Sequence, residues 1–173
     1  MSSRSTIILL LLLATPAAAQ TAGEYQVKAA FLFNFAKFVE WPAAFKSPSD
    51  PIHICILGDN PFGTMLSDLL AGKKINDRPL LGTHFFELKE VGGCQILFVS
   101  KSQRKNLRNI LAAAEAGGIL TVGEWDNFAL DGGMIGFRLE GGKVRLEVNL
   151  PAAERAQVLI SSKLLSLAQV VRK

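Results

Sequence analysis

Apolar residues fill most positions of the segment Glu24–Glu40, and no glycine or proline interrupts it. The following Trp41-Pro42 ends the pattern, because a residue before proline disfavours helical geometry. We therefore predict a helix over 24–40. A helix that is apolar on most sides is covered by its own protein or packs against a second subunit. Its phenylalanines are expected to be core residues rather than ligand contacts: Phe31, Phe33, Phe35 and Phe38.

Short apolar runs then alternate with helical patterns. Ile52–Leu57 is β-branched and apolar, as in a central strand covered on both faces. After the Gly58-Asp59 turn, Asn60 is a suitable N-cap for a helix that ends at Gly72. The pattern continues with predicted strands over 80–88, 94–99 and 119–122 and a helix over 102–116. Alternation of this kind indicates a parallel sheet with helices on its faces.

The last third of the chain begins with a hairpin. Gly141-Gly142 joins strands predicted over 134–140 and 143–150 and pairs Phe137 with Leu146, which makes one face apolar throughout. Helices are expected over 152–157 and 162–171. The predicted fold class is therefore α/β: a single compact domain with a mostly parallel sheet, flanking helices and a C-terminal antiparallel hairpin.

The N-terminus resembles a secretory leader. Arg4 precedes the apolar run Ile7–Leu13, and Ala17-Ala18-Ala19 supplies small residues for cleavage before Gln20. The alternative, an anchor helix, needs about 20 apolar residues. We expect a signal peptide over 1–19 and a periplasmic domain over 20–173 that does not itself span the membrane.

Composition and motifs exclude several functions. Of the 173 residues, 49% are hydrophobic, and the net charge of +4 is too small and too dispersed to indicate nucleic-acid binding. No Gly-x-Ser-x-Gly, Ser-x-x-Lys, His-Glu-x-x-His or nucleotide-binding fingerprint occurs, so we expect no catalytic residues and no cofactor. His53 and His84 lack the spacing of a metal site, and Gly58–Gly63 is interpreted as a strand-to-helix turn rather than an anion-binding loop.

Cys55 and Cys94 are the two cysteines of the chain. In the common doubly wound strand order their strands are neighbours, about 4.8 Å apart, which suits a disulfide. Exported proteins form such bonds readily. We predict a Cys55–Cys94 disulfide; the alternative is two unlinked buried thiols.

The polar face of the hairpin carries an unusual pair. The predicted register places Arg138 opposite Arg145, and like charges in facing positions are unfavourable. Glu140 and Glu147 lie diagonally near and are able to compensate. Two interpretations remain open: a solvated salt network, or a recognition surface formed by Arg138, Arg145 and Glu147 for an acidic partner or a small anion.

Several segments together resemble the YfiR-type periplasmic proteins, which include the HmsC-like repressors. The resemblance covers essentially the whole chain after residue 19, through EYQVKAAFLFNFAKFVEWP, ICILGDNPFG, CQILFVSKS, ILTVGEW, GGMIGFRLEGGKVRLEVNL and ISSKLLSLA. It implies a compact α/β fold, commonly dimeric and without enzymatic activity. Cys55 and Cys94 match the structural disulfide of the family, and Glu147 matches a position of its functional surface. The second cysteine pair of the best-studied type is missing here.

The resemblance also implies a function. Studied members bind the periplasmic part of an inner-membrane diguanylate cyclase and hold it inactive, and they release it under envelope or redox stress. We therefore expect a homodimeric repressor that controls cyclic di-GMP and biofilm. The alternative is a periplasmic binder of a small anionic ligand or a cell-wall fragment. Trp41, Phe45, Trp125 and Phe128 fit either an interface or the core.

Overall fold

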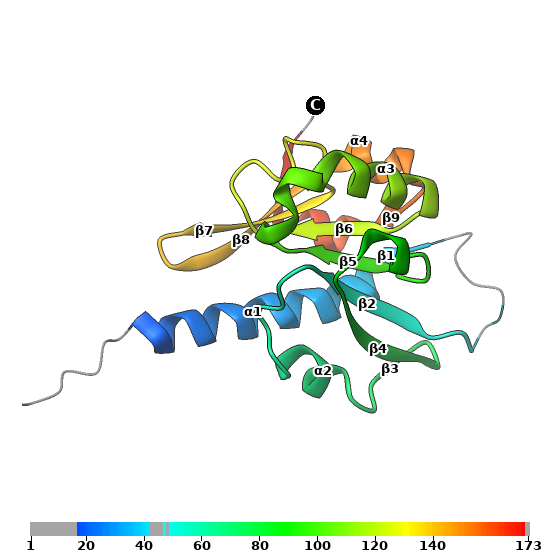
Figure 1. Ribbon diagram of the computed structural model, residues 1–173, viewed down its shortest axis with the longest axis horizontal. Helices are drawn as coiled ribbons and strands as arrows, with labels where there is room; N and C mark the ends of the chain where they lie inside the picture. The colour runs from blue at the N-terminus through cyan, green and yellow to red at the C-terminus, as the bar shows by residue number, and fades with distance from the viewer. Residues whose placement is uncertain (1–16, 42–46, 48, 172–173) are drawn as a thin grey trace, which may run out of the picture.

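An eight-stranded mixed sheet organises the protein. The computed structural model describes residues 17–41, 47 and 49–171, and the sheet has the strand order β10-β8-β7-β6-β5-β2-β4-β3 (Figure 1). The central strands β4, β2, β5, β6 and β7 are parallel, whereas β7 and β8 form an antiparallel hairpin. The predicted fold class is confirmed. The strands span Ile52–Leu57 (β2), Lys74–Ile75 (β3), Arg78–Phe85 (β4), Ile96–Val99 (β5), Leu120–Gly123 (β6), Ile135–Glu140 (β7), Lys143–Asn149 (β8) and Ala168–Val171 (β10).

Helices cover both faces of this sheet. Helix α1 (Ala17–Phe38) and helix α2 (Met65–Leu70) lie on one face, and α3 (Leu107–Gly117) lies on the other (Figure 1). The remaining helical segments are α4 (Leu150–Arg155), α5 (Ser162–Leu165) and two 3₁₀ helices, η1 (Leu88–Glu90) and η2 (Lys101–Asn106). A small second sheet pairs β1 (Val39–Glu40) with β9 (Leu159–Ile160).

Alternation along the strands separates two apolar clusters. In β2, Ile54 and Ile56 face the α1 side, whereas Cys55 and Leu57 face the α3 side. Phe35 of α1 is fully buried in the first cluster, as expected for a core phenylalanine. Of the four aromatic residues that fit either an interface or the core, three are buried: Trp41, Trp125 and Phe128. Phe45 lies outside the described residues.

The hairpin register follows the sequence prediction. Phe137 pairs with Leu146 and Arg138 with Arg145, around Gly141 and Gly142, which both have positive φ. Glycine tolerates this conformation without a Cβ clash. The apolar residues of the hairpin therefore face α1, and its charged residues lie on the opposite face.

The cysteine prediction is also confirmed. Cys55 in β2 and Cys94, just before β5, form a disulfide with a Cα–Cα distance of 6.0 Å. Strands β2 and β5 are direct neighbours, which is why the two side chains meet.

Three local predictions require correction. The helix predicted from Asn60 begins only at Met65, because Asn60 accepts a hydrogen bond from the Phe62 amide inside a preceding turn. The helix predicted over 162–171 ends at Leu165, and Ala168–Val171 is instead strand β10, parallel to β8. A short apolar run fits a strand or a helix equally well, and the free edge of β8 decides for the strand. The helix predicted over 24–40 ends at Phe38, because Val39 and Glu40 pair with β9.

The structure describes only the end of the predicted leader. Residues 1–16 lie outside the described residues, and 17–19 begin α1, so cleavage after residue 19 stays a prediction. Within the described part of the chain, no helix combines the length and the apolarity needed to cross a membrane.

Candidate functional site

The charged face of the hairpin forms a continuous ion-pair network. Arg138 Nη1 lies 3.2 Å from Glu147 Oε1, and its Nη2 lies 3.6 Å from Glu140 Oε1. Arg145 Nε lies 3.6 Å from the other oxygen of Glu140. The two facing arginines are therefore bridged by Glu140, which offsets the repulsion that their pairing creates. The structure brings together all three residues predicted for this surface.

Exposure differs sharply among these residues. The side chains of Arg138 and Arg145 are 41% and 56% exposed, whereas that of Glu147 is only 12% exposed. Glu147 stands opposite Gly136 in the hairpin register. The carboxylate of Glu147 thus pairs with Arg138 from the buried side of the hairpin surface. The surface presents the ion-paired guanidinium groups of Arg138 and Arg145 to solvent. Such groups suit bidentate recognition of carboxylates.

An apolar groove lies on the other face of the hairpin. It has a volume of about 460 Å³ between the first turns of α1 and the tip of β7–β8. Val27 and Leu139 are exposed at its walls, and Phe31 and Val144 also line it. The N-terminal end of α1 and the hairpin project together from the body of the protein (Figure 1). The hairpin therefore offers a charged surface on one side and an apolar groove on the other.

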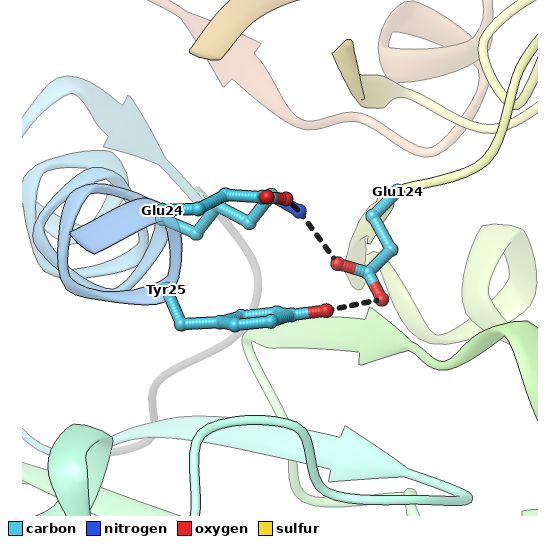
Figure 2. A network of polar contacts seen from close by, with 4 residues as sticks. Glu24, Tyr25 and Glu124 are labelled. Atoms are coloured by element: carbon cyan, nitrogen blue, oxygen red, sulfur yellow. Dashed lines mark hydrogen bonds and ion pairs between the residues drawn. The ribbon is translucent and has the colours of Figure 1, made fainter. Parts of the chain in front are cut away.

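A buried charge network fixes α1 against the sheet. Lys28 Nζ lies 2.7 Å from Glu124 Oε2, and it also pairs with Glu24 one turn earlier in the helix. Tyr25 donates a hydrogen bond of 3.2 Å to the other oxygen of Glu124 (Figure 2). The side chains of Lys28 and Glu124 are each 4% exposed. A buried ion pair requires such complete partnering, since an unpaired charge there is strongly destabilising.

Close packing holds Glu124 in place. Glu124 follows β6, whose last residue, Gly123, lies against the ring of Phe128: a Cβ there would come within 2.4 Å of the ring. On the helix side, the Tyr25 ring packs edge-on against Phe62 at 5.5 Å, and the Lys28 ammonium lies 4.7 Å from the Tyr25 ring centroid. The network is thus set into the aromatic core between α1 and the sheet.

The phenol of Tyr25 responds to this environment. Burial raises the pKa of Tyr25 to about 12, and the charge of Glu124, its hydrogen bond and the charge of Glu24 act in the same direction. The phenol therefore remains protonated and donates its hydrogen bond over the whole physiological pH range.

Sequence reasoning missed this network. Lys28 was visible as a charge inside an apolar helix, and that signal indicates a buried partner. Glu124 lies 96 residues away, however, and only the packing of α1 under β6 brings the two together. His53 and His84 lie in β2 and β4 without other ligands, and no group of three or more potential metal-binding side chains occurs among the described residues.

The chain is similar to known proteins in sequence and in fold. A family model described as YfiR/HmsC-like matches residues 25–169. No curated protein matches the chain. Among solved structures, the ABC domain from Streptococcus pneumonia in complex with L-Trp is similar with a TM-score of 0.55 and 9% identity, over 86% of this chain and 60% of that one. A conserved domain protein from Vibrio cholerae O1 biovar El Tor gives 0.47 and 15%, over 70% and 54%.

The chain spans only about three-fifths and half of the two solved chains, respectively. At such low identity, the first likeness shows a common fold alone.

Proposed function

Since the chain belongs to the YfiR/HmsC-like family, we propose that it represses an inner-membrane diguanylate cyclase by binding the periplasmic part of that enzyme. Membership of this family supports a regulatory role in the periplasm. The disulfide between Cys55 and Cys94 fits an oxidising compartment. The repressor role and the identity of the partner go further and are our proposal.

The observation that carries the proposal is the preorganised charge surface of the hairpin. Arg138 and Arg145 are exposed but held by Glu140 and the nearly buried Glu147. A surface whose side chains are already ordered loses less conformational entropy on binding. Paired guanidinium groups favour a partner with carboxylates on its own surface. We therefore assign Arg138, Arg145 and Glu147 to partner binding.

The mechanism is stoichiometric rather than catalytic. Binding to one periplasmic conformation of the cyclase shifts the population toward that conformation, by the difference in affinity between the two states. If the preferred conformation is the inactive one, the cytoplasmic half of the cyclase stops making cyclic di-GMP. A releasing signal needs only to weaken this preference.

Homodimerisation is part of the proposal. The family implication of a dimer is tested by light scattering on purified protein, which is expected to give twice the monomer mass. A mass that stays monomeric at all concentrations would remove the dimer from the proposal without affecting the repressor surface.

A charge-reversal titration tests the surface. We expect Arg138→Glu/Arg145→Glu to weaken binding to the purified periplasmic part of the cyclase by at least about tenfold, since close charge pairs at interfaces contribute more than 1.4 kcal/mol. The matched control, Lys73→Glu/Lys89→Glu, makes the same change of charge at exposed sites elsewhere. Equal weakening by both variants, or by neither, contradicts the assignment.

A further inference from the structure

The strand order reverses at the boundary between β2 and β5. From β2 the chain continues to β4 on one side and then to β5 and β6 on the other. In sheets of this kind, ligands bind in the crevice outside the carboxyl ends of the parallel strands near such a reversal.

The position between β2 and β5 themselves is filled by the protein. Ser102 Oγ accepts a hydrogen bond of 3.0 Å from the Asp59 amide, and a Cβ on Gly58 would lie 2.5 Å from the same oxygen. The available space is therefore displaced by one strand, to the carboxyl ends of β5 and β6.

A polar cavity of about 420 Å³ occupies that place. The 3₁₀ helix η2 after β5 contributes Lys101 and Arg104, and the segment after β6 contributes the other lining residues: Glu124, Trp125, Asp126 and Asn127. This volume is within the usual range of small-molecule sites, roughly 300–1,000 Å³.

The positive and the negative charges of the cavity come from two different segments of the chain. Lys101 and Arg104 come from η2, whereas both carboxylates, Glu124 and Asp126, come from the segment after β6. Within the described part of the chain, Lys101, Arg104 and Asp126 form no ion pair, whereas Glu124 is held by Lys28. Two free cations thus stand with one free carboxylate around the same space.

Trp125 adds an unsatisfied donor. Its indole N–H is buried and has no hydrogen-bond acceptor among the described residues. A buried donor without a partner is unusual in folded proteins and calls for an explanation. The indole N–H of Trp41 is buried and unpaired in the same way, so the charged side chains of the cavity, and not this donor, argue for a ligand.

We propose that this cavity binds a small zwitterion. Lys101 and Arg104 receive its carboxylate, and Asp126, the free carboxylate of the cavity, receives its ammonium group. A simple anion would pair with Lys101 and Arg104 but would leave the carboxylate of Asp126 without a counter-charge. Free amino acids and the ends of short peptides carry the required pair of charges.

Calorimetric titration of the purified protein tests the site. The probes are the common L- and D-amino acids and the dipeptide Ala-Ala, each compared with its neutral N-acetyl amide. At least one zwitterion is expected to bind with a Kd below about 1 mM, and its neutral derivative at least about tenfold more weakly. Stronger binding of single amino acids indicates a free amino acid as the ligand, and stronger binding of Ala-Ala indicates the end of a short peptide.

Variants locate the binding. Lys101→Ala/Arg104→Ala and Asp126→Asn are each expected to weaken it at least about tenfold, whereas Lys105→Ala, an exposed lysine of η2 outside the cavity lining, leaves it unchanged. Glu124 is left intact because it also holds α1. Absence of binding by every zwitterion, equal binding of the neutral derivatives, or binding insensitive to the cavity variants overturns the proposal.

Discussion

Lys28 and Glu124, 96 residues apart in the chain, form an ion pair of 2.7 Å in which both side chains are almost completely buried. The pair joins the middle of α1 to the carboxyl end of β6. The same stretch of α1 forms one wall of the apolar groove beside the hairpin. The geometry of the projecting end of the molecule therefore depends on one buried cation.

Replacing that cation is expected to destabilise the fold. Lys28→Met leaves Glu24 and Glu124 near each other without a counter-charge, and removal of one partner of a buried pair costs about 3–5 kcal/mol of unfolding free energy. Denaturant unfolding measures this loss. Lys37→Met, on the same helix at an exposed position, is the matched control and is expected to lose less than about 1 kcal/mol. Equal losses in the two variants would show that the buried pair has no special role.

The single tyrosine provides a direct optical readout of the same network. Tyrosinate absorbance is expected to titrate near pH 12, because burial and then Glu124 raise the pKa of Tyr25. Glu124→Gln should move this pKa downward, toward the ordinary value of 10. An unshifted titration in the wild-type protein contradicts the network.

The raised pKa also has a consequence for stability. The folded protein holds the Tyr25 proton more tightly than the unfolded chain, so the contribution of this group is fully present below pH 10. It is lost as the pH rises from about 10 to about 12. Chemical denaturation across this window should show a decline that is smaller in Tyr25→Phe, and an identical decline in both proteins assigns the effect to other groups.

The disulfide is expected to contribute much of the stability. It closes a loop with a sequence separation of 39, and loop-closure entropy predicts a contribution of roughly 4 kcal/mol. Cys55→Ala should therefore lower the melting temperature markedly. The double variant Cys55→Ala/Cys94→Ala should lose about the same amount, since one lost bond accounts for both. Free thiols in the non-reduced wild-type protein, seen by mass spectrometry, would exclude the bond.

Local patterns were sufficient for much of the fold. Gly141-Gly142 determines the hairpin register, and with it the pairing of Arg138 with Arg145. The buried character of the Cys55 and Cys94 segments, with the usual strand order, was enough to predict their disulfide. In each case the decisive information lies in a turn or in a recurring sheet topology.

Long-range pairing accounts for what sequence reasoning missed. Nothing within Ala168–Val171 distinguishes a helix end from a strand, and the free edge of β8 makes the choice. Val39–Glu40 leaves the helical pattern because β9, 120 residues later, supplies its partner. The Lys28–Glu124 pair belongs to the same class, since its two halves are brought together only by the packing of α1 under the sheet.

The cellular level of cyclic di-GMP tests the central claim most directly. Deletion of the gene for this chain should raise cyclic di-GMP and biofilm, because a membrane diguanylate cyclase then loses its repressor. A plasmid copy of the wild-type gene should restore the low level, and a copy carrying Arg138→Glu/Arg145→Glu, produced at the same abundance, should not. An unchanged level in the deletion strain would contradict the repressor function.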